Sequence, residues 1–272
     1  MDTPVGFEPD LLPGVDTSHR ATVERVIAAM RERVDNPLPL RAMAEIAHLS
    51  PYHFARTFRR VTGIPPGEFL GALRIERAKE LLLATDMSVA EVCFEVGYNS
   101  LGTFTTRFTQ LVGLSPGRMR RLPEELRATS FGLTGERDRT LPPVAPADDG
   151  VAFSIGDPGL LGACIFVGLF PGAIPQGRPV AGAVLTTPGV HRLAPVPDGC
   201  YHLMAAALPS PEDPLKSLLP GAPLRVGRSQ GPLAVQADRT SGLVDVKMRP
   251  PRITDPPILV ALPTLLPERS SA

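Results

Sequence analysis

The sequence SPYHFARTFRRVTGIPP at residues 50–66 and the sequence SLGTFTTRFTQLVGLSP at residues 100–116 are two copies of one pattern. Counted from the first serine of each copy, Phe stands at +4 and +8, Gly at +13 and Pro at +16. Matches at a fixed offset of 50 residues indicate an internal repeat. Each copy follows a short apolar-periodic segment and a tight turn, which is typical of a helix-turn-helix motif.

The residues around both copies predict an all-helical domain over residues 18–122. Apolar residues recur there with the i, i+3, i+4 spacing of one helix face. Ser50, Ser88 and Ser100 are placed as N-caps, and Glu91 is placed to complete a capping box with Ser88. We expect helices from Thr17 or Ser18 to about Val34, from Leu40 to Ala47, from Pro51 to before Gly63, from Phe69 to about Ala84, from Val89 to Val96, from Ser100 to Gly113, and a short last helix opened by Ser115 and Pro116.

The turn between the two helices of each motif differs in length. Four positions that we expect to be buried, Leu40, Met43, Ala44 and Ala47, match Val89, Val92, Cys93 and Val96 at an offset of 49 residues, so the second turn is one residue longer. Gly97 suits a left-handed backbone, whereas its counterpart His48 would be strained there. The first turn is therefore either slightly strained or different in geometry.

Charge divides the chain into two halves. The 272 residues hold 28 Lys+Arg and 28 Asp+Glu, so the net charge is zero. Residues 18–122 hold 15 Lys+Arg against 10 Asp+Glu, a net charge of +5. The remainder of the chain holds 13 Lys+Arg against 18 Asp+Glu, a net charge of −5. A basic segment beside an acidic one is compatible with a nucleic-acid-binding half and a half that does not bind nucleic acid.

The periodicity changes after residue 122. We expect a loose tail at residues 1–17, the helical domain at 18–122, a Pro-rich linker at 123–150 and an all-β sandwich at 151–272. Short apolar runs separated by Pro and Gly turns are typical of a sandwich. The expected strands lie at residues 151–155, 163–170, 180–185, 190–193, 201–208, 224–226, 233–235, 243–248 and 258–262.

Residues 49–66, the run LRIERAKELL at residues 73–82, and residues 97–116 together resemble the AraC/XylS family of transcriptional regulators. The resemblance covers about residues 18–122, with both helix-turn-helix motifs and the connecting helix in order. It implies a sequence-specific DNA-binding regulator of transcription. We expect no cofactor. Double-stranded DNA is its expected partner, and RNA polymerase is a candidate second partner.

The expected connecting helix allows one chain to read two grooves. Two reading helices on one face of a duplex must lie about one helical turn, roughly 34 Å, apart. Residues 69–84 as a helix span about 24 Å at 1.5 Å per residue. The half-width of a lobe at each end brings the two readers close to the required separation, without dimerisation.

We call the second helix of each motif, which starts after Ser50 or Ser100, a reader. Helix geometry separates the inner from the outer residues of each reader. Phe54 and Phe58 share the inner face, so Arg56 points outward and is the best candidate to read a guanine edge, a contact worth roughly 1–3 kcal/mol of discrimination. Arg59 and Arg60 are candidates to bind phosphates, and a solvated basic helix face is the alternative interpretation. The predicted DNA-contacting residues are Tyr52, His53, Ala55, Arg56, Arg59 and Arg60 in the first reader, and Leu101, Gly102, Thr103, Thr105, Thr106 and Arg107 in the second. The second reader has few strong donors, which favours a role in positioning.

Residues 165–170, 179–185, 196–203 and 242–248 resemble a carboxypeptidase regulatory-like or transthyretin-like β-sandwich. This resemblance transfers no functional site, because fold does not give function. Two functions remain open for this region. It is either a sensor of a small-molecule effector or a structural or protein-interaction module without a ligand. A sensor should enclose a cavity on the order of 300 Å³ or more.

An enzymatic or membrane function has little support in the sequence. No GxSxG, P-loop, HExxH or GxGxxG motif appears in context. Cys93, Cys164 and Cys200 lack metal-ligand spacing and are expected to be buried free thiols, while His191 and His202 are more simply structural than a paired site. The absence of a long apolar run and of a signal peptide predicts a cytoplasmic protein without a membrane partner.

Overall fold

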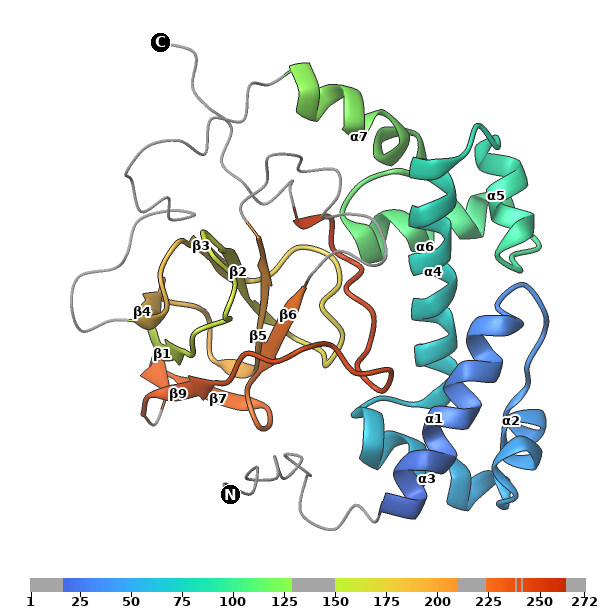
Figure 1. The fold of residues 1–272 in the computed structure, drawn as a ribbon, viewed down its shortest axis with the longest axis horizontal. Helices are drawn as coiled ribbons and strands as arrows, with labels where there is room; N and C mark the ends of the chain where they lie inside the picture. Colours follow the sequence, from blue (N-terminus) through green and yellow to red (C-terminus); the bar gives the residue numbers. More distant parts are fainter. Residues whose placement is uncertain (1–16, 129–149, 210–223, 238, 241, 263–272) are drawn as a thin grey trace, which may run out of the picture.

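A computed structural model describes residues 17–128, 150–209, 224–237, 239–240 and 242–262 of the chain. They form a helical region and a β region that lie side by side (Figure 1). The expected order of helices followed by strands is therefore confirmed. Most of the predicted tail and linker lie outside the described residues.

Seven helices are described, and all lie in the N-terminal half of the chain. The helix α4 begins at Pro66, earlier than predicted, because proline is favoured in the first turn of a helix. The helix α7 continues to Ala128, past the predicted boundary at residue 122, with Pro123 inside it. The bounds are α1 (Thr17–Glu32), α2 (Leu40–Ala47), α3 (Pro51–Thr62), α4 (Pro66–Ala84), α5 (Val89–Glu95), α6 (Leu101–Val112) and α7 (Pro116–Ala128).

The predicted serine caps are present. The hydroxyl of Ser50 accepts from the N–H of His53, and the hydroxyl of Ser100 accepts from the N–H of Thr103. At the start of α5, Glu91 N–H donates to Ser88 Oγ at 3.2 Å and Ser88 N–H donates to Glu91 Oε2 at 2.6 Å, which is the capping box. These bonds satisfy donors that the helix itself cannot pair, so α3, α5 and α6 begin at defined residues.

A pair of phenylalanines anchors each reader. The rings of Phe54 and Phe58 lie 5.5 Å apart in α3, and those of Phe104 and Phe108 lie 5.6 Å apart in α6. All four side chains are fully buried. Phe58 also meets Phe69 of α4 edge to face at 5.5 Å, a favourable aromatic geometry that fixes α3 against the connecting helix. The predicted inner faces are confirmed.

Two burial predictions are wrong. Leu40 is 42% exposed, because it opens α2 and side chains in a first turn lean back beyond the helix end. Cys200 is exposed, because successive residues of a strand face opposite sides and its neighbour Tyr201 points inward. Cys93 and Cys164 are buried free thiols, as predicted.

The two turns begin with the same left-handed geometry, although the second is one residue longer, so the first turn carries the strain. His48 has a φ of 55° and Gly97 a φ of 78°, both in the left-handed region. His48 N–H donates to Glu45 O at 3.1 Å and the next N–H reaches back to Ala44 O, and Gly97 and Tyr98 repeat both bonds. This pair of bonds is the Schellman motif, which favours glycine at the left-handed position.

We expect His48→Gly to stabilise the protein by about 0.5–1 kcal/mol, because a Cβ in the left-handed region is strained. His48 is exposed, so little packing is lost. Urea denaturation of the full chain measures the change in the free energy of unfolding. His48→Ala keeps the strain and is the control. A variant with glycine that is no more stable than the one with alanine would contradict the explanation.

Nine described strands form two sheets. One sheet has the order β4-β1-β9, and the other has the order β3-β2-β5-β7-β8, with β6 also paired to β5. The β1–β9 pair is parallel and the other strand pairs are antiparallel. The bounds are β1 (Val151–Ile155), β2 (Cys164–Phe170), β3 (Ala181–Leu185), β4 (Gly189–Leu193), β5 (Gly199–Leu208), β6 (Arg225–Arg228), β7 (Leu233–Gln236), β8 (Arg239–Thr240) and β9 (Val244–Val246).

Both sheets contribute to one hydrophobic core. Phe153 of β1 and Val246 of β9 belong to the same buried cluster as Val167 of β2 and Leu203 of β5. Every residue of β2 is buried, which requires that its other face is covered as well. A second cluster on that face joins Phe166 and Phe170 to Val260 and Leu262, near the end of the described chain.

The predicted strand at residues 258–262 is wrong. The N–H groups of Leu259 and Val260 both donate to Pro175 O, at 3.0 and 3.2 Å, and Ala261 N–H donates to Val112 O of α6 at 3.3 Å. The segment therefore finds its partners in a loop and a helix, and forms no sheet ladder. We call residues 258–262 the strap.

The strap joins the two regions. Leu259 and Ala261 are buried in the cluster formed by the helices, together with Ile174 from the β2–β3 connection. Lys79 Nζ of α4 donates to Ile258 O at 2.8 Å, and Gly177 N–H donates to Leu111 O of α6 at 2.6 Å. The segment before the end of the described chain, drawn in red, runs between the sheets and α4 (Figure 1).

Candidate nucleic-acid interface

The helix α3 presents a basic outer face. Its N-cap and its two buried phenylalanines fix the rotation of the helix about its axis. Tyr52, His53, Arg56, Arg59 and Arg60 are exposed as a result, and Tyr52 is 80% exposed. The ring of His53 lies 6.0 Å from that of a second histidine on α1, so it is partly supported although it is exposed.

The helix α6 repeats the burial pattern of α3 but not its basic character. Residues 51–60 and 101–110 share the same class of burial at nine of ten positions. The one difference lies on the second turn, where Thr57 is buried and Arg107 is exposed. The repeat in sequence is therefore also a repeat in which positions are buried and which are exposed.

Ten of the twelve predicted contact residues are exposed. The exceptions, Ala55 and Thr105, occupy equivalent positions and are half-buried. Both lie directly after a buried phenylalanine, at the edge of the inner face. Contact with DNA stays a prediction for all twelve.

The basic side chains of the readers are available for binding. In the described part of the chain, the guanidinium groups of Arg56, Arg59, Arg60 and Arg107 form no hydrogen bond or ion pair. A guanidinium carries five N–H donors in a planar fork, which suits both guanine edges and phosphates. The second reader contributes one such group and the first contributes three, as the sequence predicted.

The loop that follows α1 contacts both α4 and the second helix-turn-helix motif, and these contacts fix the separation of the two reading helices, α3 and α6. Arg74 of α4 donates from Nε to Val34 O at 3.0 Å and from Nη2 to Asn36 O at 3.0 Å. A Cβ placed on Gly97 would lie 2.4 Å from Asp35 O and 3.1 Å from Arg74 Nη2. The turn of the second motif is therefore packed directly against the loop that follows α1.

Sequence reasoning missed the role of Arg74 and of Asp35. Arg74 stands in the quoted run of the connecting helix, but its partners are backbone carbonyls, which no side-chain pattern reveals. The glycine at position 97 was the available signal, because a close approach of two backbones requires a residue without a Cβ.

The histidine pair considered from the sequence does not form one site. His191 lies on β4 and His202 lies on β5, and these strands belong to different sheets. His191 Nε2 is hydrogen-bonded with Thr187 O at 3.0 Å. Among the described residues, no group of three or more His, Cys, Asp and Glu is arranged to hold a metal ion.

Residues 43–122 match the family model described as a helix-turn-helix domain. The match contains both readers and the connecting helix α4. Within the described residues, no helix has the length and apolar character needed to cross a membrane.

Proteins similar to this chain are named as regulators of transcription. A protein of Bacillus subtilis, the "Uncharacterized HTH-type transcriptional regulator YfiF", is 32% identical over 113 residues, which are 42% of this chain and 36% of that protein. The melibiose operon regulatory protein of Escherichia coli K12 is 27% identical over 135 residues, 47% of this chain and 45% of that protein. The chain thus spans less than half the length of these relatives.

A solved structure with 29% identity is the DNA-binding domain of AdpA, a global transcriptional factor, in complex with a target DNA. The alignment covers 39% of this chain and 96% of that chain, with a TM-score of 0.38. The family model thus assigns a helix-turn-helix domain to residues 43–122 of this chain.

Proposed function

We propose that the chain is a sequence-specific regulator of transcription that places α3 and α6 in two successive major grooves of double-stranded DNA. The observation that carries this proposal is the exposed face that recurs on both helices, each held by a buried phenylalanine pair. The 19 residues of α4 span about 28 Å at 1.5 Å per residue, which suits readers set about one helical turn apart.

The two readers have different roles in this proposal. Arg56 reads a guanine edge, and Arg59 and Arg60 bind phosphates, which adds affinity without sequence information. Thr106 and its small neighbours on α6 contact thymine methyl groups or phosphates and mainly position the chain. The first reader is therefore the main source of base preference.

We expect Arg56→Ala to weaken binding to the preferred duplex by about 10- to 100-fold, the value of a good bidentate contact, and to relax the preference for one base pair. Thr106→Ala is expected to weaken binding by less than about fivefold. The measurement is selection of the full chain on a randomised duplex pool, followed by titration of the selected duplex at fixed salt.

Arg225→Ala is the matched control, because it removes the same charge from the β region. It is expected to leave both affinity and base preference unchanged. Equal losses for Arg56→Ala and Thr106→Ala would contradict the ranking of the readers. A full chain with no salt-sensitive binding to any duplex would contradict the proposed function.

The β region is proposed to be a β-sandwich accessory domain that senses a small molecule, in a cytoplasmic regulator without enzymatic activity. A core shared by both sheets supports the sandwich. The pocket of this region described below has a volume of about 70 Å³, which is less than the cavity of about 300 Å³ expected of a sensor from the sequence, so the proposed ligand is a very small one. The alternative, a structural or protein-interaction module with no ligand, is distinguished by whether this pocket binds a small molecule. RNA polymerase remains a candidate partner of the helix-turn-helix domain.

A further inference from the structure

The strap has two faces that belong to different cores. Leu259 and Ala261 are fully buried among the helices. Val260 and Leu262 are buried against β2 and β5, and Ile258 packs on the same side. Alternate residues of this short segment thus face the DNA-binding domain and the β region, so a shift of one face moves the other.

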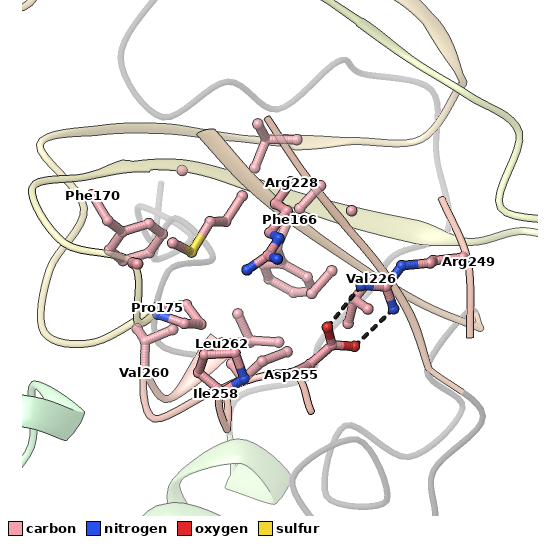
Figure 2. A pocket seen from close by; sticks show the side chains of 18 residues that line it. Phe166, Phe170, Pro175, Val226, Arg228, Arg249, Asp255, Ile258, Val260 and Leu262 are labelled. Atoms are coloured by element: carbon pink, nitrogen blue, oxygen red, sulfur yellow. Dashed lines mark hydrogen bonds and ion pairs between the residues drawn. The ribbon is translucent and has the colours of Figure 1, made fainter. Parts of the chain in front are cut away.

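A pocket lies on the β side of the strap. It is open to solvent on one side, has a volume of about 70 Å³ and is bounded by Phe166 and Phe170 of β2, by Met204 of β5, and by Val260 of the strap. Figure 2 shows Val260, Ile258 and Leu262 on one side of this space and Phe166 and Phe170 on the other. The walls are mostly apolar.

The pocket is lined by two positively charged side chains and one negatively charged side chain, so it has an excess of positive charge. Arg249 and Asp255 form a bidentate ion pair, with both N–O distances at 2.7 Å. Arg228 of β6 also lines the pocket, and its guanidinium projects into the space beside Phe166 (Figure 2). In the described part of the chain, the side chain of Arg228 forms no hydrogen bond or ion pair.

The side chain of Arg228 is half-buried, and this partial loss of solvent makes a cation without an ion-pair partner less favourable. Desolvation lowers the pKa of Arg228, and the neighbouring Arg249 acts in the same direction, while Asp255 opposes them. An arginine nevertheless stays protonated in proteins, so the charge cannot be removed by losing a proton. A bound anion would supply the missing charge and accept hydrogen bonds from the guanidinium fork.

We propose that this pocket binds a small carboxylate with a compact apolar body, whose carboxylate pairs with Arg228 while its hydrocarbon lies against Phe166, Phe170 and Val260. Two guanidinium groups and one carboxylate line the site, so it takes a ligand with a single negative charge. A volume of about 70 Å³ admits roughly five to eight non-hydrogen atoms. The pocket is much smaller than a site for a drug-sized ligand, which favours a small one.

Occupancy of the pocket is coupled to the reading domain by two routes. The strap forms one wall and carries Leu259 and Ala261 into the helical core. Arg228 forms the other route, because its Nη1 lies 3.6 Å from the position a Cβ would take on Gly63, the C-cap of α3. An anion bound to this guanidinium changes its position relative to the end of the first reader.

This coupling rests on the proposed function, whereas the binding site does not. The first experiment therefore uses the full chain without DNA and titrates it with pentanoate and with pentanamide, which has nearly the same shape and no charge. Chemical-shift changes in NMR report the affinity. We expect pentanoate to bind about tenfold or more tightly than pentanamide, because a charge-assisted hydrogen bond is stronger than a neutral one.

Variants test the assignment of the residues. Arg228→Gln is expected to weaken pentanoate binding about tenfold or more and to leave pentanamide binding unchanged. Arg225→Gln, on the same strand, is the matched control and keeps the wild-type preference. Ala206→Leu adds bulk to the wall of the pocket and should weaken both ligands. Equal affinity for the two ligands, or an unchanged pentanoate affinity in Arg228→Gln, would overturn the site.

Hydrogen exchange tests the coupling. The N–H groups of Gly177 and Ala261 are bonded to carbonyls at the end of α6, so their exchange reports the joint between the regions. Pentanoate is expected to slow exchange at both positions in the wild type and not in Arg228→Gln. Unchanged exchange with a bound ligand would overturn the coupling alone. A chain that binds pentanoate and fails to bind any duplex would refute the proposed function and leave the site intact.

Discussion

Gly97→Ala is expected to destabilise the protein by about 3 kcal/mol or more and to weaken DNA binding. Two costs combine at this position. The left-handed φ of 78° strains any residue with a Cβ, by about 1 kcal/mol. The added Cβ would also lie 2.4 Å from Asp35 O, and a backbone atom cannot rotate away as a side chain can. Relief of this contact must separate the second turn from the first lobe.

Gly113→Ala is the matched control, because Gly113 has a φ of 86° and nothing within 4 Å of the added Cβ. It carries the conformational cost alone, so we expect a loss of about 1 kcal/mol. The measurements are urea denaturation and titration of the selected duplex. Because the two readers must keep a fixed separation, Gly97→Ala is expected to bind DNA more weakly than Gly113→Ala under conditions in which both are folded. Equal losses of stability would show that the contact with Asp35 does not matter.

The stability of the protein is expected to rise by about 3 kcal/mol between pH 8 and pH 10.5 through Lys79 alone. This side chain is 7% exposed, and burial lowers its pKa from 10.5 to about 8, against the opposing effect of Glu76 and Glu80. In this pH range the unfolded chain holds the proton and the folded chain releases it. The unfolded state therefore binds more protons, and the free energy of unfolding rises with pH. Below pH 8 both states are charged and the penalty is constant.

The measurement is urea denaturation of wild type and of Lys79→Met at several values of pH. The variant keeps the length of the side chain and removes its charge, so its stability should lack the rise. Burial raises the pKa of Cys93, Cys164 and Tyr98, which lowers stability over part of the same range. These groups are present in both proteins, so the difference between the two curves isolates Lys79.

The exposed Lys247 supplies the control. Lys247→Met should follow the wild-type curve at every pH. A difference between wild type and Lys79→Met that stays constant from pH 8 to pH 10.5 would contradict the lowered pKa. Lys79 also holds the strap through its bond to Ile258 O, so the same variants show whether that bond stabilises the joint between the two regions.

The helix-turn-helix domain could be predicted from the sequence because its signals are local. Ser50 and Ser100 cap helices within three residues of themselves, and Gly63 and Gly113 end them. The phenylalanines at +4 and +8 define the buried side, so the exposed reading face follows from helix geometry alone. The repeat supplied an internal check on each of these assignments.

The strap shows where local signals fail. Residues 258–262 are all apolar, and in the β region such a run predicts a strand. Both sides of the segment are buried, but one side lies in a core built from helices more than a hundred residues earlier. No pattern within the segment identifies that second partner.

The sequence by itself determined the two capped helices, their inner phenylalanines and the outward arginines, because each depends on neighbours within one or two turns. Only the tertiary structure decided that the β region is packed into the reading domain, that Gly97 lies against Asp35, and that Arg228 faces an apolar pocket without an ion-pair partner in the described chain. These contacts join residues far apart in the chain. They depend on shape and on backbone atoms, which the order of side chains does not encode locally.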